Sequence, residues 1–160
     1  MSLPGCAVER SYGFVRIFRG SIAREPLRET ILIVPGVTVL PKIGALRAEL
    51  ADAKDFDLAS FVRRKGTDEE ALDVERLRGT LRVRHRRPGD RFHPLGGSGS
   101  RKLQDFFTDL KIPASERRSI PIVSDDDGIV WVVGYRLDER VRIAPATGRI
   151  LKMTFERTGD

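Results

Sequence analysis

Short apolar runs separated by turn-forming residues recur along the chain and limit it to a fold made mainly of β-strands. Ile and Val fill much of residues 120–123 and 129–135, and Asp125–Gly128 between them is typical of a hairpin turn. With a further turn at Thr147-Gly148, the end of the chain is predicted to form a meander. Residues 43–50 fit the period of a strand or of a helix, so both remain open there. Further strands are predicted at residues 12–18, 30–34, 37–40, 80–86, 140–144 and 149–156.

One amphipathic helix is expected directly after a glycine-rich loop at residues 96–100, ending before Pro113. Its apolar residues recur at the spacing i, i+3, i+4, i+7. They are Leu103, Phe106, Phe107 and Leu110. This stripe predicts that the two phenylalanines are core side chains and not platforms for base stacking, and Trp131 in an apolar strand is expected to be core as well.

A second, shorter helix is predicted over residues 68–77 on local grounds. Thr67 and Glu70 have the spacing of a capping box, and Gly79 follows the segment. The preceding residues 52–65 are rich in charge and interrupted, and they lead into a loop at Lys65-Gly66.

The 160 residues suffice for one domain of ordinary size or two small ones. We place a boundary near residues 77–80, where a neutral segment meets a basic one. Residues 7–79 would be a β-rich first part, and residues 80–158 a basic second part. The predicted class is therefore α+β, mainly β, with one amphipathic helix.

The positive charge is concentrated in residues 82–118. The chain holds 29 Lys and Arg against 23 Asp and Glu, a net charge of +6, and this segment alone accounts for +6. It contains ten basic and four acidic residues, while the rest of the chain is neutral. A polyanion would therefore bind one face of the protein.

Three arginines alternate with apolar residues in the predicted strand at 80–86. The alternation places Leu81 and Val83 inward and the arginines at 82, 84 and 86 outward. Such a row is stable where it is solvated or where a negative group lies across it. The alternative is a surface of salt bridges, which is disfavoured because Asp90 is the one acid among seven cations from Arg82 to Lys102.

The glycine-rich loop and the helix after it suggest an anion site. Glycine admits positive φ, so backbone N–H groups can converge, and a helix start presents unpaired N–H groups. Ser100 is predicted to cap the helix, with Arg101 and Lys102 in a first turn that disfavours cations unless an anion binds there. The residues after Gly99 fit neither a Walker loop nor a dinucleotide fingerprint. A plain flexible linker remains the alternative.

The residue types exclude several chemistries. Ser98 or Ser100 with His93 and Asp90 or Asp105 could supply a hydrolase triad, but the chain has no Gly-x-Ser-x-Gly elbow, so we expect no catalytic residue. One cysteine and two histidines give no zinc spacing, so no metal is expected either. The single cysteine fits a reducing cytosol, and no apolar run approaches the ~20 residues that span a membrane. Phe92 and His93 are the ring pair placed to touch a nucleotide.

Several strings resemble the C-terminal region of the tRNA(Ile)-lysidine synthetase family. In the basic half they are RHRRPGDRF at 84–92, PLG at 94–96, KLQDFF at 102–107, KIP at 111–113, Arg117, Pro121, the strand at 129–134 and RLDER at 136–140. In the first half they are Tyr12-Gly13, Pro35-Gly36 with Thr38, and Ala71-Leu72-Asp73. The resemblance therefore spans nearly the whole chain.

The resemblance implies a small β-rich sandwich, similar to a domain of the phenylalanyl-tRNA synthetase β-subunit, and a strand in place of a helix at residues 71–73. It implies an enzyme that uses ATP to attach lysine to the anticodon cytidine of an isoleucine tRNA. The catalytic domain of that family carries Ser-Gly-Gly-x-Asp-Ser, which does not occur here. We therefore expect the C-terminal part alone, which in the family grips the tRNA acceptor stem and self-associates, with ATP and lysine bound elsewhere.

These observations predict a cytoplasmic, tRNA-binding part of a ligase, with tRNA(Ile), the catalytic domain and a second copy of the chain as expected partners. The alternative is that residues 7–79 form a protein-interaction or dimerisation module. The predicted RNA-binding residues are Arg84, Arg86, Arg87, Arg91, His93, Ser100, Arg101, Lys102, Lys111, Arg117 and Arg118.

Overall fold

The computed structural model describes residues 6–11, 14–19 and 27–159. The first two segments are strands β1 (Cys6–Ser11) and β2 (Phe14–Arg19), which pair antiparallel along their whole length. β2 confirms most of the strand predicted at 12–18, while Tyr12 and Gly13 lie outside the described residues.

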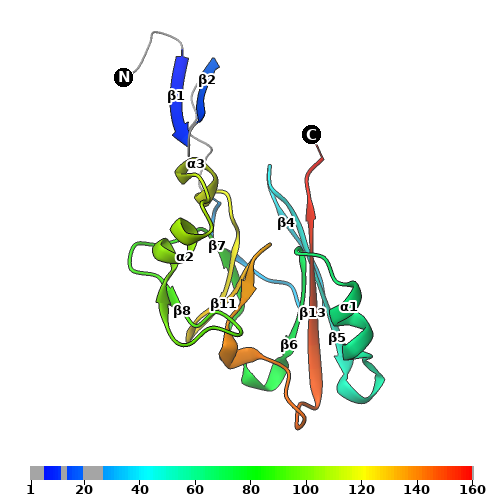
Figure 1. The fold of residues 1–160 in the computed structure, drawn as a ribbon. Coiled ribbons are helices and arrows are strands. Elements are labelled where there is room, and N and C mark those ends of the chain that lie inside the picture. Colours follow the sequence, from blue (N-terminus) through cyan, green and yellow to red (C-terminus); the bar gives the residue numbers. More distant parts are fainter. Residues whose placement is uncertain (1–5, 12–13, 20–26, 160) are drawn as a thin grey trace.

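Two sheets make up the body of the protein (Figure 1). The five-stranded sheet has the order β12-β11-β10-β7-β3, and the four-stranded sheet has the order β4-β5-β13-β6. The first comprises β3 (Thr30–Ile31), β7 (Arg82–Arg84), β10 (Ile122–Asp125), β11 (Gly128–Val132) and β12 (Arg136–Leu137). The second comprises β4 (Gly36–Leu40), β5 (Gly44–Asp52), β6 (Glu69–Asp73) and β13 (Arg149–Arg157).

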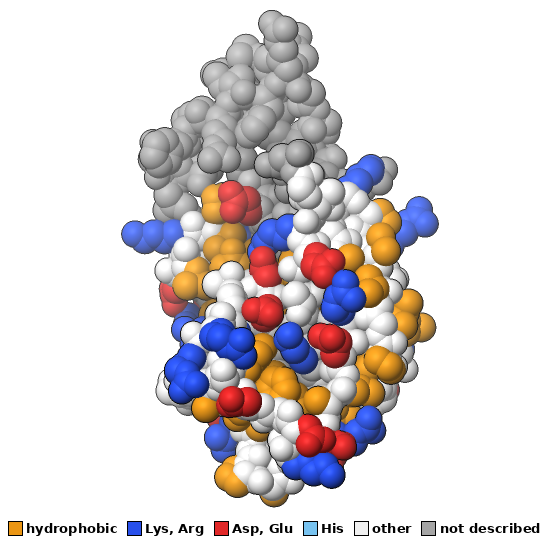
Figure 2. Space-filling view, turned by 90° about the vertical axis from the view of Figure 1, so that its right-hand side faces the viewer, with side chains coloured by type: hydrophobic (Ala, Val, Ile, Leu, Met, Phe, Trp, Pro, Cys, Tyr) orange, Lys and Arg blue, Asp and Glu red, His pale blue; other side chains and the backbone are white. Residues whose placement is uncertain are grey.

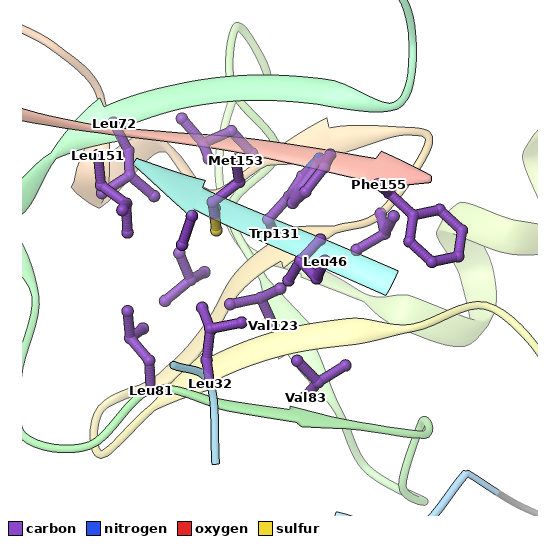
Figure 3. Close-up of a cluster of buried hydrophobic side chains, with 14 of the residues drawn as sticks. Leu32, Leu46, Leu72, Leu81, Val83, Val123, Trp131, Leu151, Met153 and Phe155 are labelled. Atoms are coloured by element: carbon purple, nitrogen blue, oxygen red, sulfur yellow. The ribbon is translucent and has the colours of Figure 1, made fainter. Parts of the chain in front are cut away.

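The main core fills the space between the two sheets (Figure 3). Trp131 is buried there, as predicted, among side chains from both sheets. They include Leu46, Leu72, Leu151 and Met153 from one sheet and Val83 and Val123 from the other. Because side chains of a strand alternate between its faces, each of these strands contributes every second residue to this core. The result is the β-sandwich that the family resemblance implied.

Helices cover the outer face of each sheet (Figure 1). The predicted amphipathic helix is α2 (Leu103–Asp109), which buries Phe106 and Phe107 against the five-stranded sheet. A short helix, α3 (Ala114–Arg117), follows it. On the other side, α1 (Leu58–Arg64) packs Phe61 against Ala71 and Ile150 of the four-stranded sheet. Leu110 was expected in the α2 stripe, but it lies beyond the helix and is exposed.

Three local predictions are wrong. Residues 69–73 are strand β6, followed by the 3-10 turn η2 (Val74–Arg76), and not the helix predicted at 68–77. Residues 139–141 form the 3-10 turn η3 (Glu139–Val141), capped by the Asp138 side chain, where a strand was predicted. The charge-rich segment 52–65 contains the 3-10 turn η1 (Ala53–Asp55) as well as α1, which the sequence reading missed.

The predicted meander is found in part. β10, β11 and β12 follow one another in the sheet, and the turn at Asp125–Gly128 joins the first two. β13 instead crosses to the other sheet and lies between β5 and β6. The ambiguous stretch at 43–50 belongs to β5.

Strands from both sides of residues 77–80 share the two sheets. β3 pairs with β7, and β13 pairs with β5 and β6. One core contains residues from Leu27 to Phe155. The division into 7–79 and 80–158 therefore describes the charge of the chain, and packing joins the two parts. Within the described residues, no helix is long and apolar enough to cross a membrane.

Candidate nucleic-acid interface

The basic segment covers one side of the five-stranded sheet. It leaves the sheet at β7, turns at residues 87–90, and forms the short ladder of β8 (Arg91–Phe92) with β9 (Arg101–Lys102) before entering α2. β8 and α2 lie together on the left of Figure 1. The Leu103 N–H donates a hydrogen bond of 2.8 Å to the carbonyl of Asp90, which ties the turn to the helix.

Arg84 does not face outward as the strand alternation predicted. The residue is 6% exposed, and its guanidinium donates two hydrogen bonds, of 2.9 and 3.0 Å, to the two carboxylate oxygens of Asp90. Asp90 also accepts a 2.7 Å hydrogen bond from the Arg87 N–H. A buried guanidinium needs a carboxylate to compensate its lost hydration, and Asp90 provides it. Arg84 therefore stabilises the turn at 87–90 and does not face the solvent.

Acids from distant parts of the chain reach the basic segment. Glu29 pairs with Arg87 at 2.9 Å and lies 3.9 Å from Arg82, which also pairs with Asp126 at 3.0 Å. Within the segment, Arg101 pairs with Asp109. The count of one acid for seven cations was therefore too low, because it considered neighbours in sequence only.

The glycine-rich loop and the start of α2 already use several of their backbone donors. Gly96 N–H donates to the Glu139 carboxylate at 3.0 Å, and Gly97 N–H donates to the Pro94 carbonyl at 2.8 Å. Ser100 does not cap the helix: the N-cap position is Lys102, which lies in β9 with Arg101. The phosphate site predicted from a Ser100 cap and free N–H groups of the glycine-rich loop is therefore not formed.

The ring pair at 92–93 is turned inward. Phe92 is 3% exposed and meets Phe106 edge-on, with ring centroids 5.0 Å apart. His93 is half-buried, and its Nε2 lies 3.0 Å from the Gly97 carbonyl oxygen. A base could therefore not stack on Phe92, and His93 supports the loop.

Six of the ten cations of the segment have no acid partner among the described residues. Arg91 contacts Ser100 at 3.4 Å, and Arg117 donates to the Ile112 carbonyl at 2.9 Å and lies over the Phe107 ring. The side chains of the other four make no ion pair or hydrogen bond with the residues that the structure describes. They are Arg86, Lys102, Lys111 and Arg118. The last three are exposed, and Arg86 is half-buried.

Arg136 joins this surface, and the sequence reading overlooked it because it lies outside residues 82–118. It is exposed, and its Nη1 donates to the Leu95 carbonyl at 3.1 Å, next to the glycine-rich loop. Arg136 is the first residue of the RLDER string, one of the strings that resemble the family, and this resemblance was the signal that could have identified it.

The face on the side of α1 and β5 has a different character (Figure 2). Acidic and basic side chains are interspersed across it. On the four-stranded sheet, Arg47 pairs with Glu156 at 3.2 Å and Arg157 pairs with Asp68 at 2.8 Å. Lys152 lies within 4.0 Å of two further carboxylates. These three cations of the four-stranded sheet are therefore balanced by nearby carboxylates.

The fold and its surface define a two-sheet α+β domain with helices on both outer faces and a basic segment on one side. The sequence model of the TilS substrate C-terminal domain matches residues 81–153. A crystal structure of a TilS C-terminal domain superposes with a TM-score of 0.68 at 30% identity, covering 82% of this chain and 98% of that one. The chain belongs to the tRNA(Ile)-lysidine synthase family, to the part that forms its C-terminal domain.

Curated relatives agree with this assignment. The tRNA(Ile)-lysidine synthase of Caldanaerobacter subterraneus is 38% identical over 127 residues, which are 79% of this chain and 26% of the relative. That of Symbiobacterium thermophilum is 36% identical over an alignment of 164 positions, which covers 98% of this chain and 33% of the relative. The chain thus spans about a quarter to a third of the length of these relatives.

Proposed function

We propose that this chain binds tRNA by its sugar-phosphate backbone, through the cations on the side of β8, β9 and α2. The observation that carries the proposal is the set of six cations in residues 82–118 without an acid partner among the described residues. Phosphates are the groups that such cations bind, and an A-form stem offers them in regular rows. Arg86, Arg91, Lys102, Lys111 and Arg118 are the proposed contacts.

The mode of binding follows from which side chains lie at the surface. The phenylalanines of this region, Phe92, Phe106 and Phe107, are buried, so they offer no platform for an unstacked base. Arginine and lysine contacts to phosphates position a protein on RNA without reading its sequence. The proposed grip therefore recognises the shape of a stem, and Arg84, Arg101, Ser100 and His93 hold the segment in place.

By its family, the chain would serve a ligase that uses ATP and lysine to modify the anticodon cytidine of tRNA(Ile) in the cytoplasm. ATP and lysine would bind to the catalytic domain, and this part would hold the tRNA, at its acceptor stem, while the anticodon is modified. This assignment is supported by the family membership and by the cations on the side of β8, β9 and α2.

The salt dependence of binding tests the grip. About five phosphate contacts give a slope of about −4.5 for log K against log [salt], using the coefficient of duplex DNA. Fluorescence anisotropy with a labelled tRNA at several salt concentrations measures this slope. An affinity that does not change with salt would contradict the proposal. The matched control is Lys54→Ala with Arg63→Ala, two exposed cations beside and on α1, which should leave the slope unchanged.

A second candidate function is self-association through the open edges of the sheets. β3 and β4 are edge strands, and both carry or adjoin exposed apolar side chains. These are Ile31, Ile33, Val37 and Val39, with exposed fractions of 63, 54, 39 and 67%. Exposed edges of this kind can pair with another chain. Sedimentation at several concentrations without RNA distinguishes this candidate, since a dimeric module associates by itself.

A further inference from the structure

A small pocket lies between the turn after β7 and the start of α2. Arg86, Arg87 and Asp90 line it on one side, and Lys102 and Gln104 line it on the other. The 2.8 Å hydrogen bond from Leu103 N–H to the Asp90 carbonyl and the pairing of Arg91 with Lys102 hold the two sides together. The pocket is therefore formed by segments that are fixed relative to each other.

The charge inside the pocket is positive. Asp90 is the one acid of the lining, and its carboxylate is already occupied by the Arg84 guanidinium and the Arg87 N–H. Arg87 shares its charge with Glu29. Arg86 and Lys102 have no acid partner among the described residues. Two uncompensated cations and the Gln104 amide therefore border one recess.

The size of the pocket limits what can enter it. Its cavity volume is about 40 Å³. On this measure one water molecule occupies about 10–15 Å³, so the pocket has room for a group of a few heavy atoms. A phosphate group fits this description, and a nucleobase with its ring of six or more heavy atoms does not.

We propose that this pocket receives one phosphate group of the bound RNA. The inference rests on the proposed RNA-binding function and names a subsite within it. Arg86 and Lys102 supply the charge, and Gln104 can donate a hydrogen bond from its amide. The phosphate belongs either to the 5′ end of an RNA strand or to the backbone within it, and both sources share this chemistry.

Inorganic phosphate tests the pocket without RNA. In an NMR titration in which phosphate replaces chloride at constant pH and ionic strength, we expect saturable shifts of the amide signals of Gly89, Lys102 and Gln104. The shifts should vanish in the double variant Arg86→Gln with Lys102→Gln and persist in Lys54→Gln. Absent or linear shifts, or shifts that survive in the double variant, would overturn the proposal. Unchanged spectra elsewhere confirm that the double variant is folded.

Two RNA hairpins, one with a 5′-phosphate and one with a 5′-hydroxyl, identify the source. If the pocket holds a terminal phosphate, the 5′-phosphate hairpin binds several-fold more tightly, and the double variant removes that difference. If it holds an internal phosphate, both hairpins bind equally, and the double variant lowers the salt slope by about one for each lost contact. Unaltered binding of both hairpins to the double variant would exclude RNA phosphate from the pocket, whatever inorganic phosphate does.

Discussion

Arg84 and Asp90 form a two-pronged ion pair that is almost withdrawn from solvent. The two hydrogen bonds measure 2.9 and 3.0 Å, and the side chains are 7% and 13% exposed. A buried pair of this kind adds little net stability compared with apolar residues, because both charges lose their hydration. Removing one partner is costly, however, because it leaves the other charge buried and unpaired.

Asp90→Ala should therefore destabilise the protein by about 3–5 kcal/mol, as expected for an orphaned buried charge. The variant also removes the acceptor of the Arg87 N–H. Urea unfolding at neutral pH measures the change. The control is Glu29→Ala, which breaks an exposed pair with Arg87 and should cost at most about 1 kcal/mol. Equal effects of the two substitutions would show that burial of the Arg84 pair does not matter.

The stability should fall in acid because of Asp125. Burial by itself would raise the pKa of Asp125, but the hydrogen bond from Arg140 and those from the Arg78 and Asp127 N–H groups outweigh it and hold the pKa below 3.8. A carboxylate whose pKa is lower in the folded state contributes stability that is complete above about 3.8 and is lost as the pH falls through the folded-state pKa.

Asp125→Asn should consequently lower the free energy of unfolding at pH 7 by about 1.5–3 kcal/mol, the range for hydrogen bonds to charged groups. The difference from the original protein should narrow below pH 3.8, where the Asp125 carboxylate itself becomes protonated. Denaturant unfolding at neutral pH and at successively lower pH checks this. A constant difference at all pH values would exclude titration of Asp125 as the cause.

Gly44→Ala should weaken the pairing of β5 with β13. Gly44 has a φ of +155°, and a Cβ there would lie 2.1 Å from the Glu156 carbonyl oxygen. Strained backbone of this kind costs about 1–3 kcal/mol, which thermal or urea unfolding can resolve. Gly66→Ala is the control, because it lies in open space without a positive φ and should be neutral. A harmless Gly44→Ala would mean that the strand end moves freely.

Arg86→Ala with Arg87→Ala should weaken tRNA binding and leave the melting temperature unchanged. Arg86 has no acid partner among the described residues, and the Arg87 pair with Glu29 is exposed, so neither supports the fold much. Anisotropy with labelled tRNA and a thermal melt of the same sample measure both effects. Loss of the fold would instead assign these arginines to a structural network.

Sequence reasoning succeeded where a local pattern and a buried face agree. The stripe of α2, the hairpin at Asp125–Gly128 and the inward Trp131 all belong to this class. It failed at residues 68–77, where the capping-box spacing of Thr67 and Glu70 predicts a helix. Residues 69–73 instead pair with β13, and Glu70 binds Lys65 at 2.9 Å, so tertiary pairing overrides the local preference.

The sequence predicted where the candidate site lies, but not which of its cations form ion pairs with acids. The concentration of charge in 82–118 located the basic side. Glu29 and Asp126 decide which cations have an acid partner, because they pair with Arg87 and Arg82. Glu29 directly precedes β3, and Asp126 lies in the turn between β10 and β11. Such partners are separated from the segment by long stretches of chain, so no sequence window contains them. The same limit explains why Arg84 was expected at the surface.

β13 is a central strand of its sheet, although it is formed by residues 149–157 near the end of the described chain. The pair Arg47–Glu156, for example, joins residues 109 positions apart. Chains are made from the N-terminus, and contacts between distant residues close slowly. During synthesis, β5 can pair with β4, but its other edge and β6 lack their common partner until residues 149–157 have been made. In that interval the edge of β5 that later pairs with β13 is open to pairing with another chain.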